Sequence, residues 1–243
     1  MLNYLSAELW RMARRRLDLI WCAAYLLLVG VVALSWTGAP LHQTMEGFRD
    51  FLVIGLYLGY PLAALADGEA RRLGTLRNEV SYGLPRGRIY LGKLLVSMLV
   101  ALAACVVLIG FYLGGCWLLF PHDGSDGTVW SLLGYCLAGA FPLWLGGQAL
   151  VMACYFLVRS STMAAFLSIG ILVVLASVFQ TLGLLISPVF ECIRHFLPGV
   201  MLDTLASMAF DWPYVGLCWI VGAVWCVGST AVGLAIFRRK EIR

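Results

Sequence analysis

The sequence has 243 residues, of which 62% are hydrophobic and only 12% are charged, and its formal net charge is +4. Soluble domains carry about a quarter charged residues, so this composition excludes an ordinary soluble domain. Several uncharged runs are as long as the ~20 residues that a helix needs to cross a ~30 Å hydrocarbon core. We therefore predict an integral membrane protein.

Six membrane-spanning helices are predicted, because the apolar runs are continuous and do not alternate as the strands of a barrel would. The fold class is thus all-α, with a single transmembrane domain over 1–243. The first run is too long for a signal-peptide core and lacks a small-residue cleavage site, so we expect it to be retained. The predicted spans are 17–36, 51–66, 94–119, 130–157, 163–186 and 214–237.

The first sixteen residues, MLNYLSAELWRMARRR, predict an amphipathic helix that lies in the membrane interface. Its arginines would face anionic lipid headgroups. The simplest interpretation is a lipid anchor. The predicted apolar face holds Leu2, Leu5, Leu9, Met12 and Ala13, and the polar face holds Asn3, Arg11, Arg14 and Arg15.

The basic residues predict the orientation of the chain. Fifteen of the seventeen Lys and Arg residues fall on one side of the six predicted spans, and only Arg49 and Arg194 fall on the other. Basic residues are retained on the cytoplasmic side. Both termini and the loop 67–93 are therefore predicted to be cytoplasmic, while 187–213 is predicted to be external.

The external segment 187–213 is too polar to span. We expect Pro198-Gly199 to divide it into two short amphipathic helices that re-enter the outer leaflet. The predicted apolar lines are Val189, Ile193 and Phe196 on one piece, and Leu202, Leu205 and either Met208 or Ala209 on the other.

The loop 67–93 contains the densest basic segment, RRLGTLRNEVSYGLPRGRIYLGK over 71–93. A helix over 69–84 would be amphipathic, and Pro85 would end it because proline lacks a backbone donor. The simpler interpretation is a juxtamembrane loop that sets the membrane topology and binds lipid. The ordered polar stripe and the abrupt end favour a docking surface. The apolar face holds Leu73, Leu76, Val80 and Leu84, and the polar stripe holds Arg71, Thr75, Asn78 and Tyr82.

This loop resembles the one between the second and third helices of type-2 ABC exporter permeases. The resemblance is close over 69–95 and loose over the rest of the chain. The sequence departs from the family near Gly83 and Leu84, where the family often has a proline. The matching positions are Glu69, Gly74, Thr75, Arg77, Ser81, Pro85, Arg86, Tyr90, Lys93 and Leu94.

The resemblance implies that the loop carries a coupling helix, which docks on a separate ABC ATPase subunit that binds ATP and Mg. It also implies a second permease copy and a plasma-membrane exporter. Small permeases of this family often handle antimicrobial peptides in bacteria, so we expect an amphipathic peptide as cargo. The predicted docking residues are Glu69, Arg71, Thr75, Arg77, Asn78, Ser81, Tyr82 and Arg86.

Two features inside the predicted spans remain open to more than one interpretation. Gln148 is the most central polar side chain, and we favour an interhelical hydrogen bond there over a contact in the substrate path. Gly110 and Gly114 form a GxxxG pair. We expect it to pack within one subunit, with a dimer contact as the alternative.

The sequence contains no GxxxxGK[ST] phosphate loop, HExxH motif or CxxC pair, so we predict no catalytic, cofactor or metal residues and no nucleic-acid partner. A membrane enzyme would need a cluster of catalytic side chains, and the sequence shows no such cluster. A secondary transporter would carry charges in mid-span, and none is found there. A non-transporting immunity or sensor protein that only binds a peptide is not separated from an exporter by the sequence.

Overall fold

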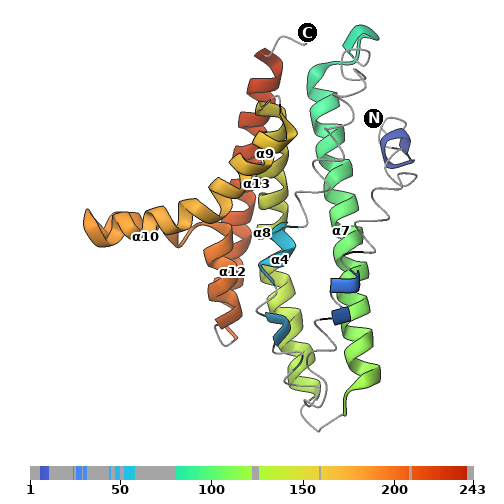
Figure 1. The fold of residues 1–243 in the computed structure, drawn as a ribbon, viewed down its shortest axis with the longest axis vertical. Coiled ribbons are helices and arrows are strands. Elements are labelled where there is room, and N and C mark those ends of the chain that lie inside the picture. The colour runs from blue at the N-terminus through green and yellow to red at the C-terminus, as the bar shows by residue number, and fades with distance from the viewer. Residues whose placement is uncertain are drawn as a thin grey trace.

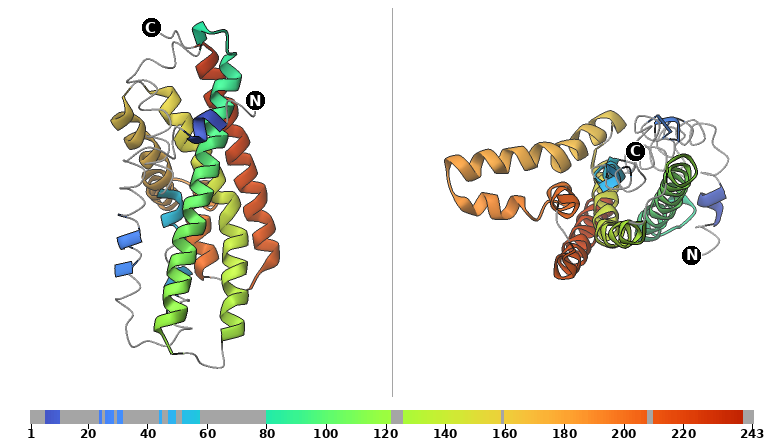
Figure 2. Two further views of the ribbon diagram at one scale, coloured as in Figure 1. Left: turned by 90° about the vertical axis from the view of Figure 1, so that its right-hand side faces the viewer. Right: turned by 90° about the horizontal axis from the view of Figure 1, so that it is seen from below.

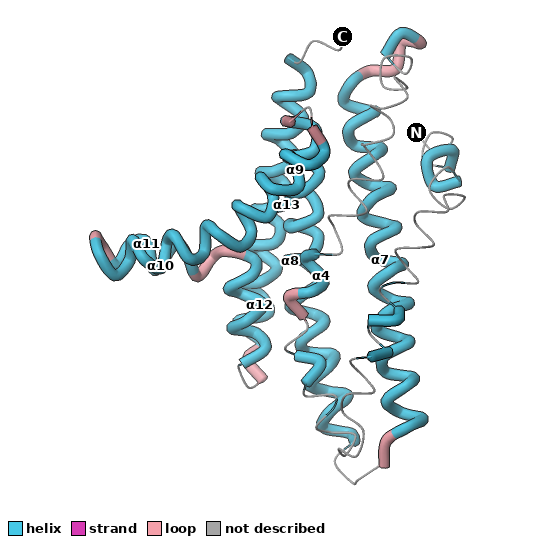
Figure 3. Tube along the Cα trace, viewed as in Figure 1, coloured by secondary structure: helices cyan, strands magenta, loops and turns pink. Residues whose placement is uncertain are grey.

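The structure is a computed structural model that describes residues 6–10, 24, 26–28, 30–31, 44, 47–49, 52–57, 80–121, 126–158, 160–207 and 210–239. The elements of this described part are all helices joined by turns and loops (Figure 3). Most of the predicted spans 17–36 and 51–66 lies outside the described residues. Of these two spans, 24, 26–28 and 30–31 are helical, as is the short α4 (Ile54–Tyr57).

Three long helices form an elongated bundle (Figure 1). They are α7 (Arg86–Leu119), α8 (Asp126–Leu157) and α13 (Trp212–Arg239). Together with Ser161–Leu185 they give four helices in the described residues that are long and apolar enough to cross a membrane. The third, fourth, fifth and sixth predicted spans lie within or almost within these four.

The helix α7 begins at Arg86, earlier than the predicted span 94–119. Its 34 residues give a length of about 51 Å at 1.5 Å per residue. A hydrocarbon core is about 30 Å thick, so one or both ends of α7 must extend beyond it. Hydropathy located the apolar part of the helix and missed its charged first two turns.

The central helix is α8, which packs most extensively against α13. The part of α8 that is long enough to cross a membrane is Trp130–Leu157. In its most apolar stretch of 18 residues, 78% is buried inside the protein. Close approach is possible because small residues meet at the crossing: a Cβ on Gly222 would collide with the backbone of Pro142, and one on Gly146 would lie 3.0 Å from the Gly222 carbonyl oxygen. Glycines therefore set the distance between the two helices.

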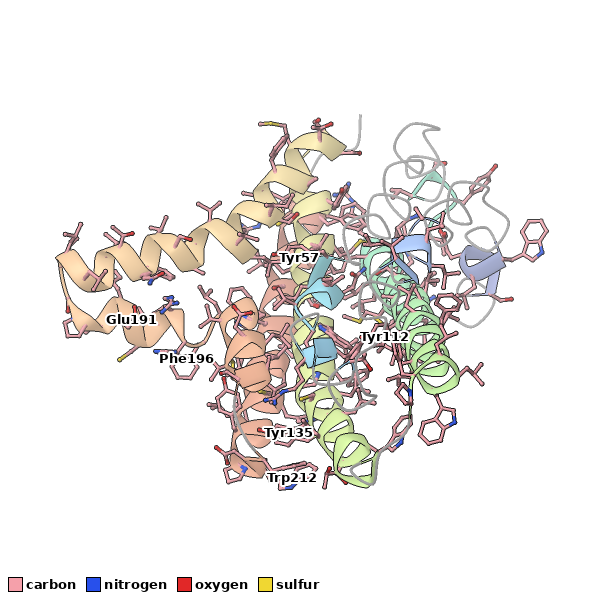
Figure 4. The ribbon with its side chains drawn as sticks, turned by 60° about the horizontal axis from the view of Figure 1, so that its bottom comes forward. Tyr57, Tyr112, Tyr135, Glu191, Phe196 and Trp212 are labelled. Carbon is pink, nitrogen blue, oxygen red and sulfur yellow. The ribbon has the colours of Figure 1, made fainter. Side chains whose placement is uncertain are left out.

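Two buried clusters lie along α8. The first half of α8 joins α4, α12 and the start of α13, and its residues include Tyr135 and Leu143. The second half joins the start of α7 and the end of α13 through residues such as Met152 and Phe156. Tyr135 stands against Trp212 at one end of the bundle, with their rings nearly perpendicular and 5.6 Å apart (Figure 4).

The candidate span Ser161–Leu185 bends away from the bundle. It consists of α9 (Ser161–Ile169), the π-helical turn η1 (Gly170–Val174) and α10 (Leu175–Leu185). In Figures 1 and 2, α10 points outward across the axes of the three long helices. The Ser168 hydroxyl donates to the carbonyls of Ala164 and Ala165, both at 2.9 Å. Such back-bonding and π-turns bend helices.

Two short helices occupy most of the segment 187–213, namely α11 (Pro188–Arg194) and α12 (Pro198–Ser207). Pro198 starts the second helix, as suits a residue without a backbone donor. The two predicted apolar lines have different environments. Leu202 and Leu205 are buried against α8, whereas Val189, Ile193 and Phe196 are exposed on the projecting hairpin that α11 forms with α10.

Candidate functional site at the start of α7

The predicted coupling segment is described from Val80 onward. Val80 and Ser81 are helical, Tyr82 and Gly83 form a turn, Leu84 lies outside any helix, and Pro85 is extended. The prediction of a helix over 69–84 is therefore wrong at its end, because the helix stops at Ser81. Gly83 has a positive φ of 82°, and its N–H donates to the Val80 carbonyl at 3.0 Å.

Glycine in this left-handed conformation ends helices at low cost. The residue before a proline also avoids helical angles, which explains why the helix does not continue through Leu84. The stop thus comes from Gly83 and Pro85 together, and not from Pro85 alone.

The turn presents an aromatic side chain to the outside. Tyr82 is 87% exposed, and Ser81 is exposed as well. These are the two predicted docking residues that the structure describes at the surface of the turn. The other predicted docking residues except Arg86 lie outside the described residues: Glu69, Arg71, Thr75, Arg77 and Asn78.

Arg86 binds the end of another helix. Its Nη1 donates to the carbonyl oxygens of Phe237 at 3.3 Å and Arg238 at 2.7 Å. The last carbonyls of a helix lack intrahelical partners and carry a partial negative charge. The guanidinium therefore satisfies the end of α13 and fixes it to the start of α7.

Tyr90 is fully buried, with 0% of its surface exposed. Its ring packs edge-on against Phe156 of α8, with centroids 4.8 Å apart. Its hydroxyl lies at Gly233 of α13, where a Cβ would collide with it. No described residue is a hydrogen-bond partner of this hydroxyl. The tyrosine thus fills the space between α7, α8 and α13.

Lys93 forms an ion pair in the interior. Its Nζ lies 3.2 Å from Oε1 of Glu8, and the two side chains are 1% and 7% exposed. Residues 6–10 are helical, so the pair joins the predicted interfacial helix to α7. Sequence reasoning placed Lys93 in the cytoplasmic loop and gave Glu8 no role. The sequence did contain a hint of a role for Glu8, since it is the one acidic residue in 1–16.

Arg86, Tyr90 and Lys93 occupy one face of α7, because residues spaced by four and three positions line up on a helix. They connect α7 to α13, to α8 and to the helical residues 6–10, respectively. A displacement of the exposed turn at Tyr82 would therefore be passed to several segments at once.

Gln148 lies in α8 between the two buried clusters. The predicted interhelical hydrogen bond is wrong for the part of the chain that the structure describes, because neither Oε1 nor Nε2 has a hydrogen-bond partner there. The side chain lines a cavity between α4, α7 and α8. The prediction that Gly110 and Gly114 pack within the subunit is also wrong, since both are exposed.

No protein-family model matches the chain, and no curated protein matches it. The membrane character of the chain is indicated by its four long apolar helices.

Proposed function

We propose that the chain is the membrane-spanning permease subunit of an ATP-driven exporter of the type-2 ABC kind. The observation that carries the proposal is the exposed Tyr82 turn that leads into the anchored start of α7. A loop that only set topology would need positive charge. It would need neither a sharply bounded turn nor three connections to the bundle.

In this proposal the ATPase is a separate chain, and two permease copies and two ATPase subunits form the working unit in the plasma membrane. ATP and Mg bind the ATPase. Closure of the ATPase pair pushes on the segment that ends at Ser81 and Tyr82. Because α7 is connected to α13 and α8 near this point, the push shifts the helices together. An amphipathic cargo, for which a peptide is our first candidate, then moves outward.

The charge distribution argues against a secondary transporter. The four candidate spans contain no Asp or Glu residue, and ion-coupled carriers usually place such residues in their spans. A non-transporting immunity protein would bind the peptide but would have no use for an ATPase-docking turn. The test therefore measures the dependence of ATPase binding on that turn.

The experiment uses the full chain co-expressed with the ABC ATPase encoded beside it. Tyr82→Ala should reduce the co-purified ATPase, because truncation of an interface anchor costs about 2 kcal/mol or more. Stimulated ATP hydrolysis in proteoliposomes should fall in parallel. The matched control is Phe210→Ala, which removes an exposed aromatic ring just before the start of α13, the helix whose far end Arg86 binds.

Full ATPase recovery with Tyr82→Ala, at a folded yield equal to that of Phe210→Ala, would contradict docking through this turn. Absence of any neighbouring ATPase gene would contradict the exporter as a whole. A peptide-binding immunity protein would then be the better explanation of the chain.

A further inference from the structure

The cavity beside Gln148 lies where the two buried clusters of the bundle meet. Its volume is about 30 Å³. A water molecule needs about 10–15 Å³ on this measure, so the cavity has room for a group of two or three non-hydrogen atoms. The described residues that line it come from α4, α7 and α8: Gly55, Met98, Ala101, Leu102, Cys105, Phe141, Trp144, Leu145 and Gln148.

Gln148 is the polar exception in this lining. It is 4% exposed, and both its Oε1 and its Nε2 are buried without a hydrogen-bond partner among the described residues. A buried polar group without a partner carries its full desolvation cost, and an amide carries it at a donor and at an acceptor. Such an arrangement is stable only if the rest of the bundle maintains it, and it is relieved by a ligand.

The wall around Gln148 is fixed without using its amide. The indole Nε1 of Trp144 donates to the Leu52 carbonyl at 2.9 Å, so this nearby donor is already engaged. Gly55 lies directly against Trp144, and a Cβ on Gly147 would lie 2.6 Å from Leu56. These contacts hold α4 on α8 and leave the cavity on the α7 side.

The cavity also reaches the outside of the bundle. Leu102 of α7 lines it and is 40% exposed. The surface around this position is apolar, since Leu99 and Val106 on the same helix are exposed too. A molecule whose polar end enters the cavity therefore has an apolar surface against which its tail can lie.

We propose that the Gln148 cavity binds the neutral polar end of an amphipathic molecule, a group that both donates and accepts hydrogen bonds as a carboxamide does. The described lining contains no charged side chain, and an ion buried there would lack a counter-charge. An amide is matched by a second amide, because each supplies the donor that the other accepts.

That the bound molecule is the exported cargo rests on the proposed function. The binding site itself belongs to this chain alone. A test without ATPase or ATP therefore separates the two, because the site can be present in a protein that does not export.

The experiment uses the purified full chain in lipid nanodiscs and a photoactivatable probe, a dodecanamide that carries a diazirine in its tail. After irradiation, mass spectrometry measures the labelling of peptides that contain 98–105 and 141–148. Gln148→Leu should lower this labelling about fivefold, as expected for one net hydrogen bond. The matched control is Gln180→Leu, because Gln180 is exposed on α10.

Unlabelled dodecanamide should compete with the probe, whereas dodecane should not. Ala101→Phe keeps Gln148 and fills the cavity from α7, so it should give the same loss and exclude a folding defect special to Gln148→Leu. Labelling of Gln148→Leu at the wild-type level would overturn the proposal. Equal competition by dodecane would overturn it as well, because the cavity would then bind apolar groups only.

Discussion

Lys93 Nζ lies 3.2 Å from Glu8 Oε1 although the two residues are 85 positions apart in the chain. Both side chains are almost completely buried. The contact joins the helical residues 6–10 to the third turn of α7. The N-terminal segment is thus packed into the protein at this point, in addition to any contact with lipid.

Removing one partner of this pair should strongly destabilise the protein. Glu8→Leu leaves a buried ammonium group without its carboxylate, and such a loss costs about 3–5 kcal/mol. The double variant Glu8→Leu with Lys93→Met removes both charges and should recover most of the loss. Chemical unfolding in detergent micelles measures the four corners of this double-mutant cycle. Additive effects of the two single changes would show that the pair is not coupled.

Arg86→Lys should loosen the end of α13, because the guanidinium nitrogen Nη1 that donates to two carbonyls is replaced by a strongly hydrated ammonium group on a flexible stem. Amide hydrogen exchange should become faster in the last turn of α13, by about fivefold for a loss near 1 kcal/mol.

Arg88→Lys is the matched control, since Arg88 is exposed two positions further along α7. It should leave the exchange of the α13 end unchanged. Equal exchange in wild type and Arg86→Lys would mean that an ammonium group replaces the Nη1 contacts without loss.

Tyr90→Phe should preserve or raise stability. The hydroxyl is buried and has no hydrogen-bond partner in the described ranges, so its removal abolishes a desolvation cost of about 1–3 kcal/mol. Gly233→Ala should destabilise by about 1–3 kcal/mol through overpacking, and Tyr90→Phe should partly rescue it. Gly228→Ala is the control on the same helix, because that position is exposed and open. Thermal unfolding in nanodiscs ranks the stabilities of Tyr90→Phe, Gly233→Ala, their combination and Gly228→Ala.

The predicted topology places Ser81 and Ser207 on opposite sides of the membrane. Both are exposed, and the segments that carry them lie at opposite ends of the bundle (Figure 1). In a background without the native cysteines, an impermeant thiol reagent applied to intact cells should modify a cysteine at Ser207 and spare one at Ser81. The reverse pattern would invert the orientation, and modification of both would exclude a spanning bundle.

The sequence predicted the parts of the fold that depend on hydrophobicity alone. The apolar parts of α7, α8 and α13 lie where the runs 94–119, 130–157 and 214–237 indicated. Hydropathy did not find the charged start of α7, because it counts Arg86 and Lys93 as unfavourable whatever they contact. Their charges are matched by carbonyl groups and by Glu8, which come from distant parts of the chain.

The sequence did not predict the bend at η1, or that Gln148 has no hydrogen-bond partner in the described part of the chain, and the reason is related. Residues 161–185 form one apolar run, and its composition does not show that Ser168 bonds back to the preceding turn. A glutamine in a span usually finds a partner on a neighbouring helix. The packing of α4 and α7 decides whether a donor or acceptor lies within hydrogen-bond distance of the Gln148 amide. A local sequence pattern does not predict that packing.

The burial of α8 has a consequence for biosynthesis. Its main partner is α13, which follows it in the chain with α9–α12 in between. When α8 enters the bilayer, the surface around Gly146 that later receives α13 is still covered by lipid or by the insertion machinery. The nascent protein must therefore hold α8 in a provisional environment until α13 has been translated. Variants that weaken the α8–α13 crossing should be recognised by membrane quality control before they lose any activity.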